Sequence, residues 1–516
     1  MDKLKTLGEA AALISDGDTI WINAFSAIAS PTDLNRAIGR RFRETGHPRN
    51  LTVYSSFSFG DWNDPSEVEA YICEGAVDCI VGGFFGSMKS VANAITSNRI
   101  EGYNLPGGVM SHMIRAAAKG STQLFSRIGL NLFVDPRIGQ YRLNQRSKRD
   151  LVSLGEEGGV PGLIYKIPHI DVALLKASCS DTRGNISFMD EGASIDALSA
   201  AQAAHRSGGK VIVQVQRVIR SRIPPTSVTI PAALVDAIVI CEDQPQLTNI
   251  EGYFDYISGK YVPTGKVFEA CRDQIRNAMG QRTVRSDLHR AIARRAFREI
   301  RPGQIVNVGI GIPELIADEV LAAGLIEDVH LSVESGHTGG YPLGGTAFGA
   351  VVGADTMMDM ARQFDFYEGG GLDIAFIGAL QVDKHGNVNG HYAKGKLSGI
   401  GGFANITQTT KKVVFCCTFS AKGLSGSFDG GTMRITREGD IVKLVPQVDA
   451  LSFNAENSRA MAQEVLYVTE RCVFTLGHDG LVLTEVAPGV DLQRDILDRL
   501  DFTPEISPEL KIMDIL

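Results

Sequence analysis

The segment DVALLKASCSDTRGNI (171–186) recurs 202 residues later as DIAFIGALQVDKHGNV (373–388). The two segments align without a gap and are identical at six of sixteen positions. Each is an apolar run that leads into a D-x-x-G-N turn, and the same offset places VIV (211–213) on VVF (413–415). Chance similarity between two strands would not keep a turn and the next strand in step, so we predict two homologous halves.

Short apolar runs rich in β-branched residues alternate with helical stretches along the whole chain. Runs that are apolar on both faces are typical of strands in a parallel sheet with helices on both sides. We therefore predict an α/β fold of two tandem homologous open domains with mostly parallel sheets. The predicted strands lie in 19–25, 77–83, 171–177, 210–215, 304–310, 329–334, 373–379 and 412–417, and two predicted helices in 287–300 and 313–325.

A weaker similarity pairs DGDTIWINAFSAIASP (16–31) with RPGQIVNVGIGIPE (301–314). Each has a glycine-bounded strand, a turn of small residues and then a proline that begins a helix. The polar segment 273–287 lies between the halves and suits an exposed linker. We predict an N-terminal domain over 1–275, a linker over 276–286 and a C-terminal domain over 287–516.

The composition excludes several classes of protein. Of 516 residues, 44% are hydrophobic and 21% charged, and 51 Lys plus Arg against 59 Asp plus Glu give a net charge of −8, which disfavours a nucleic-acid partner. Nowhere do 18 apolar residues run together, which disfavours a membrane partner, and the eight cysteines form no CxxC pair. The ten histidines show no ligand spacing, so no metal is predicted. We expect a cytoplasmic protein.

Glycine is in excess, at 56 residues. Glycine-rich turns gather in the second half, several where strands would end, in 306–313, 332–340, 367–373 and 398–403. The carboxyl ends of strands form the ligand crevice of open α/β sheets. Backbone N–H groups in such turns bind anions, including a developing oxyanion. The sequence therefore predicts one pocket lined by glycine turns.

Glu334 is the candidate reactive residue of this pocket. It ends the apolar run VHLSV and is followed by Ser335 and Gly336, which would aim its carboxylate into the crevice. A carboxylate in a dry, dipole-lined pocket can act as a base or as a nucleophile. Its competitor is Glu368 in YEGGG, which precedes a strand, and the structural alternative for Glu334 itself is a surface glutamate at a turn.

Several motifs resemble those of type I CoA-transferases, and more closely those of single-chain acetate/propionate CoA-transferases in which two subunit-like halves are fused. They occur in family order and cover nearly the whole chain. The motifs are YNLPGGVMSHMIRAAAKG (103–120), LFVDPR (132–137), DTRGNISF (181–188), VESGHTGG (333–340), FDFYEGGGLDIAFIGALQVDKHGNVN (364–389), GIGGFANIT (399–407), KKVVFCCTF (411–419) and LVLTEVAPGVDLQRDIL (481–497).

The resemblance implies a ping-pong exchange between an acyl-CoA and a short-chain carboxylic acid through a thioester between Glu334 and CoA. It implies no permanently bound cofactor, because CoA is the substrate. Gly401 and Gly402 match the turn expected to stabilise the oxyanion. Gly309, Gly311 and Gly378 match the surface expected to hold the pantetheine arm.

Two positions depart from the family pattern. Position 107 is Gly where relatives commonly carry Gln, so either another group supplies that hydrogen bond or a larger acyl substrate fills the vacated volume beside Gly107 and Gly108. His337 stands where relatives usually have Pro. It either tunes Glu334 through its protonation or is a polar rim.

Other features and rivals complete the prediction. The basic run 142–149 is either a contact for the CoA phosphates or a solvated loop. Asp181 and Asp383 are expected to cap their own turns. A thioester hydrolase and a non-catalytic metabolite-sensing module are the rival functions, and we expect a homo-oligomer that acts on small molecules.

Overall fold

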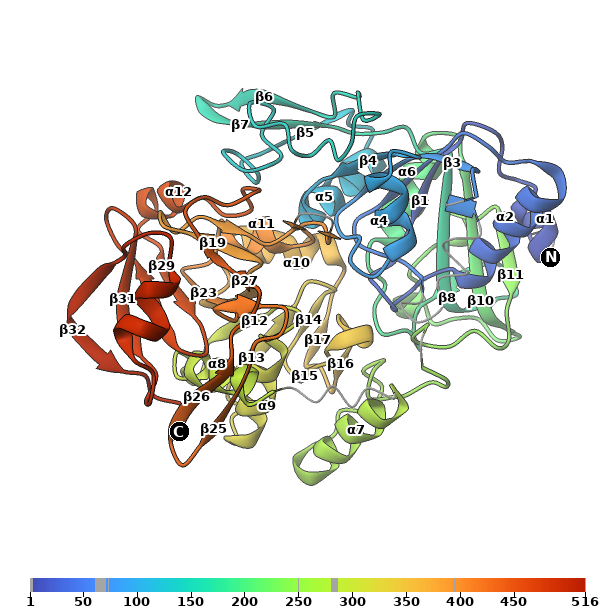
Figure 1. Ribbon diagram of the computed structural model, residues 1–516. Coiled ribbons are helices and arrows are strands. Elements are labelled where there is room, and N and C mark those ends of the chain that lie inside the picture. The colour runs from blue at the N-terminus through green and yellow to red at the C-terminus, as the bar shows by residue number, and fades with distance from the viewer. Residues whose placement is uncertain are drawn as a thin grey trace.

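The computed structural model describes residues 3–60, 71–72, 74–248, 250–279, 286–393 and 396–515. Its main feature is two large sheets, one in each half of the chain (Figure 1). The sheet of the N-terminal half has the order β11-β10-β8-β1-β2-β3-β4, with every neighbouring pair parallel. Its strands are β1 (Thr19–Ile22), β2 (Leu51–Ser55), β3 (Val77–Gly82), β4 (Glu101–Asn104), β8 (Val172–Asp181), β10 (Lys210–Ile219) and β11 (Ala237–Ile240).

The second sheet has the order β17-β14-β13-β12-β18-β23-β29-β30-β31-β32. Its centre, from β13 to β29, is parallel, and antiparallel pairs join it on both sides. Its strands are β12 (Ile305–Val308), β13 (His330–Val333), β14 (His337–Thr338), β17 (Thr356–Met357), β18 (Ile374–Gly378), β23 (Lys412–Cys416), β29 (Glu464–Val468), β30 (Cys472–Leu476), β31 (Leu481–Val486) and β32 (Glu505–Ile512).

Helices accompany both sheets, as expected of an α/β fold. Those of the N-terminal half are α1 (Leu7–Ala11), α2 (Thr32–Thr45), α4 (Lys89–Thr96), α5 (Gly107–Ala118), α6 (Ala197–Arg206) and α7 (Gly265–Ala278). Those of the C-terminal half are α8 (Asp287–Phe297), α9 (Glu314–Ala322), α10 (Met360–Glu368), α11 (Phe403–Thr407) and α12 (Ala455–Ala460). None of the helices in the described part of the chain is long and apolar enough to cross a membrane.

The internal repeat is confirmed in the register of the sheets. Val172 of β8 lies opposite Lys210 of β10, and Ile374 of β18 lies opposite Lys412 of β23, so both pairs keep the offset of 202 residues. The weaker similarity holds as well, because β1 pairs with β8 as β12 pairs with β18. The order β10-β8-β1-β2 of one sheet therefore corresponds to β23-β18-β12-β13 of the other.

The two D-x-x-G-N turns form the same hydrogen bonds. Asp181 Oδ1 accepts the N–H groups of Arg183 and Asn185 at 2.9 and 3.0 Å. In the second half, Asp383 Oδ1 accepts the N–H groups of His385 and Asn387, both at 3.0 Å. These aspartates cap their own turns, which is the structural use that their sequence context predicts.

The predicted linker falls largely outside the described residues, since 280–285 are not among them. Just before this gap, α7 packs against the C-terminal half: Arg276 bridges to Asp318 at 2.7 Å, and Phe268 lies beside Gly353. The domain boundary at 276–286 stays a prediction.

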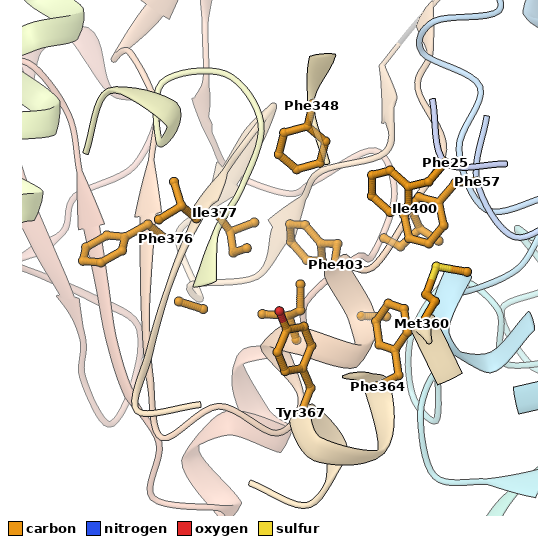
Figure 2. Packing of buried hydrophobic residues seen from close by; sticks show 14 of the residues in the cluster. Phe25, Phe57, Phe348, Met360, Phe364, Tyr367, Phe376, Ile377, Ile400 and Phe403 are labelled. Carbon is orange, nitrogen blue, oxygen red and sulfur yellow. The ribbon is translucent and has the colours of Figure 1, made fainter. Parts of the chain in front are cut away.

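One hydrophobic core joins the two halves. It contains Phe25 and Phe57 from the N-terminal half together with Phe348 and Phe364 from the C-terminal half. The ring centroids of Phe25 and Phe57 are 4.3 Å apart, and those of Phe25 and Phe348 are 6.0 Å apart (Figure 2). Because apolar rings from both halves pack together, the loops at the ends of the two sheets are brought face to face.

Candidate active site

Glu334 follows directly after β13, at the carboxyl end of that strand, as its sequence context predicts. Its side chain lines a cavity of about 350 Å³, and only 6% of the residue is exposed. Burial raises the pKa of the carboxyl to about 7, against smaller lowering effects of its own backbone N–H and of the Asn307 side chain. The residue is therefore a buried carboxyl that ionises near neutral pH.

The cavity runs along the carboxyl edge of the second sheet. Its floor is formed by Gly309, Gly378 and Cys416, which lie at the ends of three further strands, β12, β18 and β23. The N-terminal half supplies the opposite wall through Phe25, Ser26, Phe57 and Phe84. The predicted glycine-lined crevice is thus present, and both halves of the chain enclose it.

Two neighbouring glycines of the 398–403 turn behave differently. A Cβ on Gly402 would lie 2.9 Å from Glu334 Cγ and 3.0 Å from Glu334 Oε1, so this backbone lies directly against the carboxyl. The Gly402 N–H has no acceptor among the described residues. The Gly401 N–H is already donated to the Gly83 carbonyl at 2.7 Å, and the Gly401 carbonyl accepts the Gly107 N–H at 2.8 Å. Of the two predicted oxyanion donors, Gly402 is the one that lies against Glu334.

Gly309, Gly311 and Gly378 all line the cavity, where the sequence places the pantetheine surface. Two of their N–H groups are already used: Gly309 donates to the Phe376 carbonyl and Gly311 to Glu314 Oε1, both at 2.9 Å. These glycines therefore shape the floor mainly by leaving room above the backbone, and Gly311, at φ 96°, is in the left-handed region that favours glycine.

The structure corrects the expectation that a larger acyl substrate fills the volume beside Gly107 and Gly108. Neither lines the cavity, and the volume beside Gly107 is not vacant, because a Cβ there would lie 2.7 Å from the Phe57 ring. Gly108 is packed against Asn405 and Phe364 in the same way, and its N–H is donated to Asn405 Oδ1 at 3.2 Å. The two glycines allow the start of α5 to dock on the second half; Phe57 fills the space that a larger substrate was expected to take.

The structure also corrects the expectation for His337. It is fully buried and does not line the cavity, so it is neither a polar rim nor a wall of the pocket. Its Nε2–H donates to the Gly192 carbonyl at 2.7 Å, and its Nδ1 lies 3.0 Å from Ser335 Oγ. Burial lowers the pKa of this imidazole to about 4. The residue is a neutral anchor between the halves.

Two further sequence candidates lie elsewhere. Glu368 does not line the cavity; it accepts a hydrogen bond from Asn405 Nδ2 at 2.7 Å and lies 3.6 Å from His112. The arginines of the basic run 142–149 are held in ion pairs with acidic side chains of their own half. These pairs are Arg142–Asp150, Arg146–Asp78 and Arg149–Glu101.

Sequence reasoning missed the aromatic wall and a polar cluster behind Glu334. In that cluster, Ser332 Oγ lies 2.7 Å from the Tyr367 hydroxyl and accepts Gln363 Nε2–H at 2.8 Å. Asn307 Nδ2 donates to the Ser332 carbonyl at 3.2 Å. The available signal was the strand pattern itself, because Asn307 and Ser332 are polar residues that interrupt the apolar runs of β12 and β13, and both are buried.

Comparison with known proteins gives a consistent result. The family model described as coenzyme A transferase matches residues 4–240 and 289–422. Acetate CoA-transferase YdiF of Escherichia coli (strain K12) is 39% identical over 508 residues, which cover 98% of this chain and 93% of that protein. Caffeate CoA-transferase of Acetobacterium woodii is 37% identical over 521 residues, which cover 100% of this chain and 97% of the relative.

Solved structures agree over the same length. The apoenzyme of acyl-CoA transferase YdiF from Escherichia coli O157:H7 superposes with a TM-score of 0.91 at 37% identity, covering 99% of this chain and 95% of that one. The thioester complex of YdiF with CoA superposes with a TM-score of 0.91 at 36% identity and the same coverage. A matching family model and full-length relatives at this identity show that the chain belongs to the coenzyme A transferase family and is a CoA-transferase.

Proposed function

We propose that Glu334 is the nucleophile through which this CoA-transferase moves CoA between an acyl-CoA and a short-chain carboxylic acid. The observation that carries the proposal is that Glu334 is the one carboxyl group among the described residues that line the cavity. It is buried, and the backbone of Gly402 lies against it. A glutamate so placed can attack an acyl carbonyl and form an acyl intermediate.

The reaction proceeds in steps that conserve activated acyl groups. The Glu334 carboxylate attacks the thioester carbonyl, the C–S bond breaks, and a mixed anhydride forms as CoA leaves as a thiolate. The thiolate then attacks the Glu334 carbonyl and releases the first acid, which leaves a thioester between Glu334 and CoA. A second acid reverses these steps. A thioester and an anhydride are both high-energy acyl species, so the exchange needs no ATP.

The surrounding backbone has two tasks in this proposal. The unengaged N–H of Gly402 stabilises the negative oxygen of the tetrahedral intermediate, a role in which loss of one donor typically costs about 100- to 1000-fold. Gly309, Gly311 and Gly378 leave a smooth floor for the pantetheine arm. Binding energy of the distant nucleotide can then be used at the reacting carbonyl.

Trapping of the intermediate tests the proposal. The protein is incubated with acetyl-CoA and no acceptor, treated with borohydride and digested. We expect the peptide that contains Glu334 to be modified, and we expect Glu334→Gln to abolish both modification and exchange. An unmodified peptide in a preparation that still turns over, or exchange by Glu334→Gln, would refute the assignment.

A thioester hydrolase is the rival reaction, since water could also resolve the intermediate. The apolar rings around the buried carboxyl favour transfer, because they restrict the access of water. The two reactions are separated by measuring acetyl-CoA consumption with and without a carboxylic acid. Consumption that does not depend on the acid would establish hydrolysis. A non-catalytic sensing module does not fit a CoA-transferase.

We also propose that the enzyme acts in the cytoplasm and as a homo-oligomer. Seven cysteines are described, all free and six of them buried, which supports a reducing compartment. The edge strand β32 exposes Ile506 and Ile512 at 40% and 71%, and an exposed apolar edge is a surface suited to association. Light scattering of the purified protein tests this, and a monomeric mass at micromolar concentration would refute it.

A further inference from the structure

We propose that the end of the cavity beside Glu334 is an acyl chamber for apolar monocarboxylic acids, and that Phe57, admitted by Gly107, helps to select them. The proposal rests on the proposed role of Glu334, because the acyl group must lie beside the atom that attacks it. It adds a substrate class and a specificity-determining pair of residues to that function.

The cavity has two distinguishable ends. Glu334 follows β13, whereas Cys416 ends β23, and these strands are three positions apart in the sheet. Neighbouring strands are about 4.8 Å apart, so the two ends are separated by about 14 Å. The CoA arm and the acyl group leave the reacting carbonyl in different directions. With the arm along the glycine floor, the acyl group points to the wall from the N-terminal half.

That wall is aromatic at the Glu334 end. A Cβ on Gly401, the neighbour of the glycine that contacts Glu334, would lie 3.3 Å from the Phe57 ring. Phe25 lies against Gly349, whose carbonyl accepts the hydroxyl of Ser335 at 2.5 Å. Figure 2 shows the rings of Phe25 and Phe57 side by side, and Ile400 and Phe403 line the same cavity. The reacting carboxyl therefore opens onto phenyl rings.

In the described part of the chain, no buried cation lines this cavity to receive a second carboxylate. Among the described residues, the cations in the cavity wall are Lys396 and Lys443. Lys396 is exposed to solvent. The backbone N–H of Lys443 is donated to the Phe419 carbonyl, three residues beyond Cys416, which places Lys443 at the far end. A carboxylate buried among the rings would lose its hydration without gaining a partner.

The chamber has room for more than an acetyl group. An apolar cavity of about 150 Å³ accommodates benzene. The whole cavity measures about 350 Å³, which leaves space for the thiol end of CoA as well. The acyl groups that fit this chamber are therefore uncharged chains and rings up to the size of a phenyl group.

Gly107 controls the position of the Phe57 ring. A Cβ at 107 would lie 2.7 Å from Phe57 Cε2 and Cζ, and 3.1 Å from the Ser56 carbonyl. The backbone carbonyl cannot move as a side chain does, so any side chain at this position must displace the ring toward the cavity. Because Gly107 has no side chain, the Phe57 ring can pack against it, and this position of the ring sets the width of the chamber.

Acceptor selectivity tests the chamber. With acetyl-CoA as donor, kcat/KM is measured for isotopically labelled acetate, whose exchange into acetyl-CoA is followed by the label, and for pentanoate, 3-phenylpropanoate and glutarate, which has the length of pentanoate and a second carboxylate. We expect 3-phenylpropanoate to be accepted, and pentanoate to exceed glutarate by on the order of 100-fold, as for a buried group left without its partner. Equal values for pentanoate and glutarate would overturn the chamber. Absence of exchange with every acid, acetate included, would instead refute the proposed function.

Variants test the pair. Gly107→Ala should lower kcat/KM at least tenfold more for 3-phenylpropanoate than for acetate, because the displaced ring narrows the chamber. Phe57→Leu keeps an apolar side chain and provides a second test if Gly107→Ala does not fold. It should change the ratio of kcat/KM for 3-phenylpropanoate to kcat/KM for acetate by about tenfold, which is the effect expected from the loss of a few methylene contacts. Gly8→Ala and Phe474→Leu, both outside the cavity, should leave that ratio unchanged. An unchanged ratio in both Gly107→Ala and Phe57→Leu would overturn the assignment.

Discussion

Replacing Glu334 by Gln should make the folded protein more stable at alkaline pH while it abolishes the reaction. Glu334 is 6% exposed in the wild type, and its Oε2 is buried with no hydrogen-bond partner among the described residues. Burial raises its pKa from 4.5 to about 7. An ionised carboxylate at this site is therefore destabilised relative to the same group in the unfolded chain, and the uncharged amide removes that cost.

The magnitude follows from the displaced pKa. Each pKa unit corresponds to 1.36 kcal/mol, so a rise from 4.5 to about 7 amounts to about 3 kcal/mol. The folded state holds the proton more tightly than the unfolded state does. The stabilisation from this protonated carboxyl is thus fully present below pH 4.5 and is lost as the pH rises through about 7. Because the buried amide also needs hydrogen bonds, about 3 kcal/mol is an upper bound on the gain.

Denaturant unfolding of the wild type and Glu334→Gln at several pH values between 4.5 and 9 measures this effect. We expect the difference in unfolding free energy to grow in favour of the variant across that range and to level off above about pH 8. Glu156→Gln, on the exposed strand β6 (Val152–Glu157), controls for the loss of one negative charge. A difference that is independent of pH, or a wild type that is the more stable protein at pH 8, would refute the reasoning.

Three further predictions concern Glu334, Gly402 and the anchor His337. The rate at which acetyl-CoA forms the thioester between Glu334 and CoA should rise with pH through an apparent pKa of about 7, because the proposed nucleophile is the Glu334 carboxylate. Rapid-quench measurement of the acetate released in this step gives the rate, and a flat profile from about pH 5 to 9 would contradict the prediction. Gly402→Ala should lower turnover about 100- to 1000-fold, because the new methyl group displaces the Glu334 carboxyl and the Gly402 N–H donor. Gly8→Ala is the control. Wild-type turnover by Gly402→Ala would remove Gly402 from the site. His337→Ala should cost about 1–3 kcal/mol of stability by denaturant unfolding, because it leaves the buried Gly192 carbonyl without its donor, and an unchanged midpoint would contradict the anchoring role.

The fold could be predicted from the sequence because the evidence for it is local and repeated. In a duplicated unit the turn and the following strand keep the same sequence offset. The register pairs Val172 with Lys210 and Ile374 with Lys412, which confirms that offset in the structure. The side strands β30 to β32 lie outside the repeat that the sequence shows; β30 pairs antiparallel with β29 and β31, and β32 pairs parallel with β31. Duplication therefore predicts the centre of each sheet and not its edges.

The position of Glu334 could be predicted because a strand end is a local feature, but its neighbours could not. Phe25 and Phe57 reach the cavity from loops of the first half that lie 309 and 277 residues before Glu334 in the sequence. Strand patterns say which face of a sheet a residue occupies, and they do not say which loops of another sheet meet it. Only the packing of the shared core fixes that arrangement.

His337 illustrates why nearness in sequence misled. β14 turns back on β13 so that His337 lies directly opposite Val333. Cross-strand partners share one face of a sheet, and successive residues along a strand alternate between faces. His337 is therefore on the face of Val333, and Glu334, the next residue after Val333, leaves toward the other side. Three residues of separation in the chain thus place the imidazole and the carboxyl on opposite sides of the strand.

The 398–403 turn both holds the two halves together and lines the candidate active site. Gly401 gives its N–H to Gly83 and its carbonyl to Gly107, both in the first half, so it is fully used in holding the halves together. Gly402, the next residue, keeps its N–H free of acceptors among the described residues and lies against Glu334. Because the hydrogen bonds of Gly401 fix the peptide plane that follows it, the donor of Gly402 is oriented before substrate binds. Docking of the two halves therefore preorganises the N–H group that we propose as the oxyanion donor.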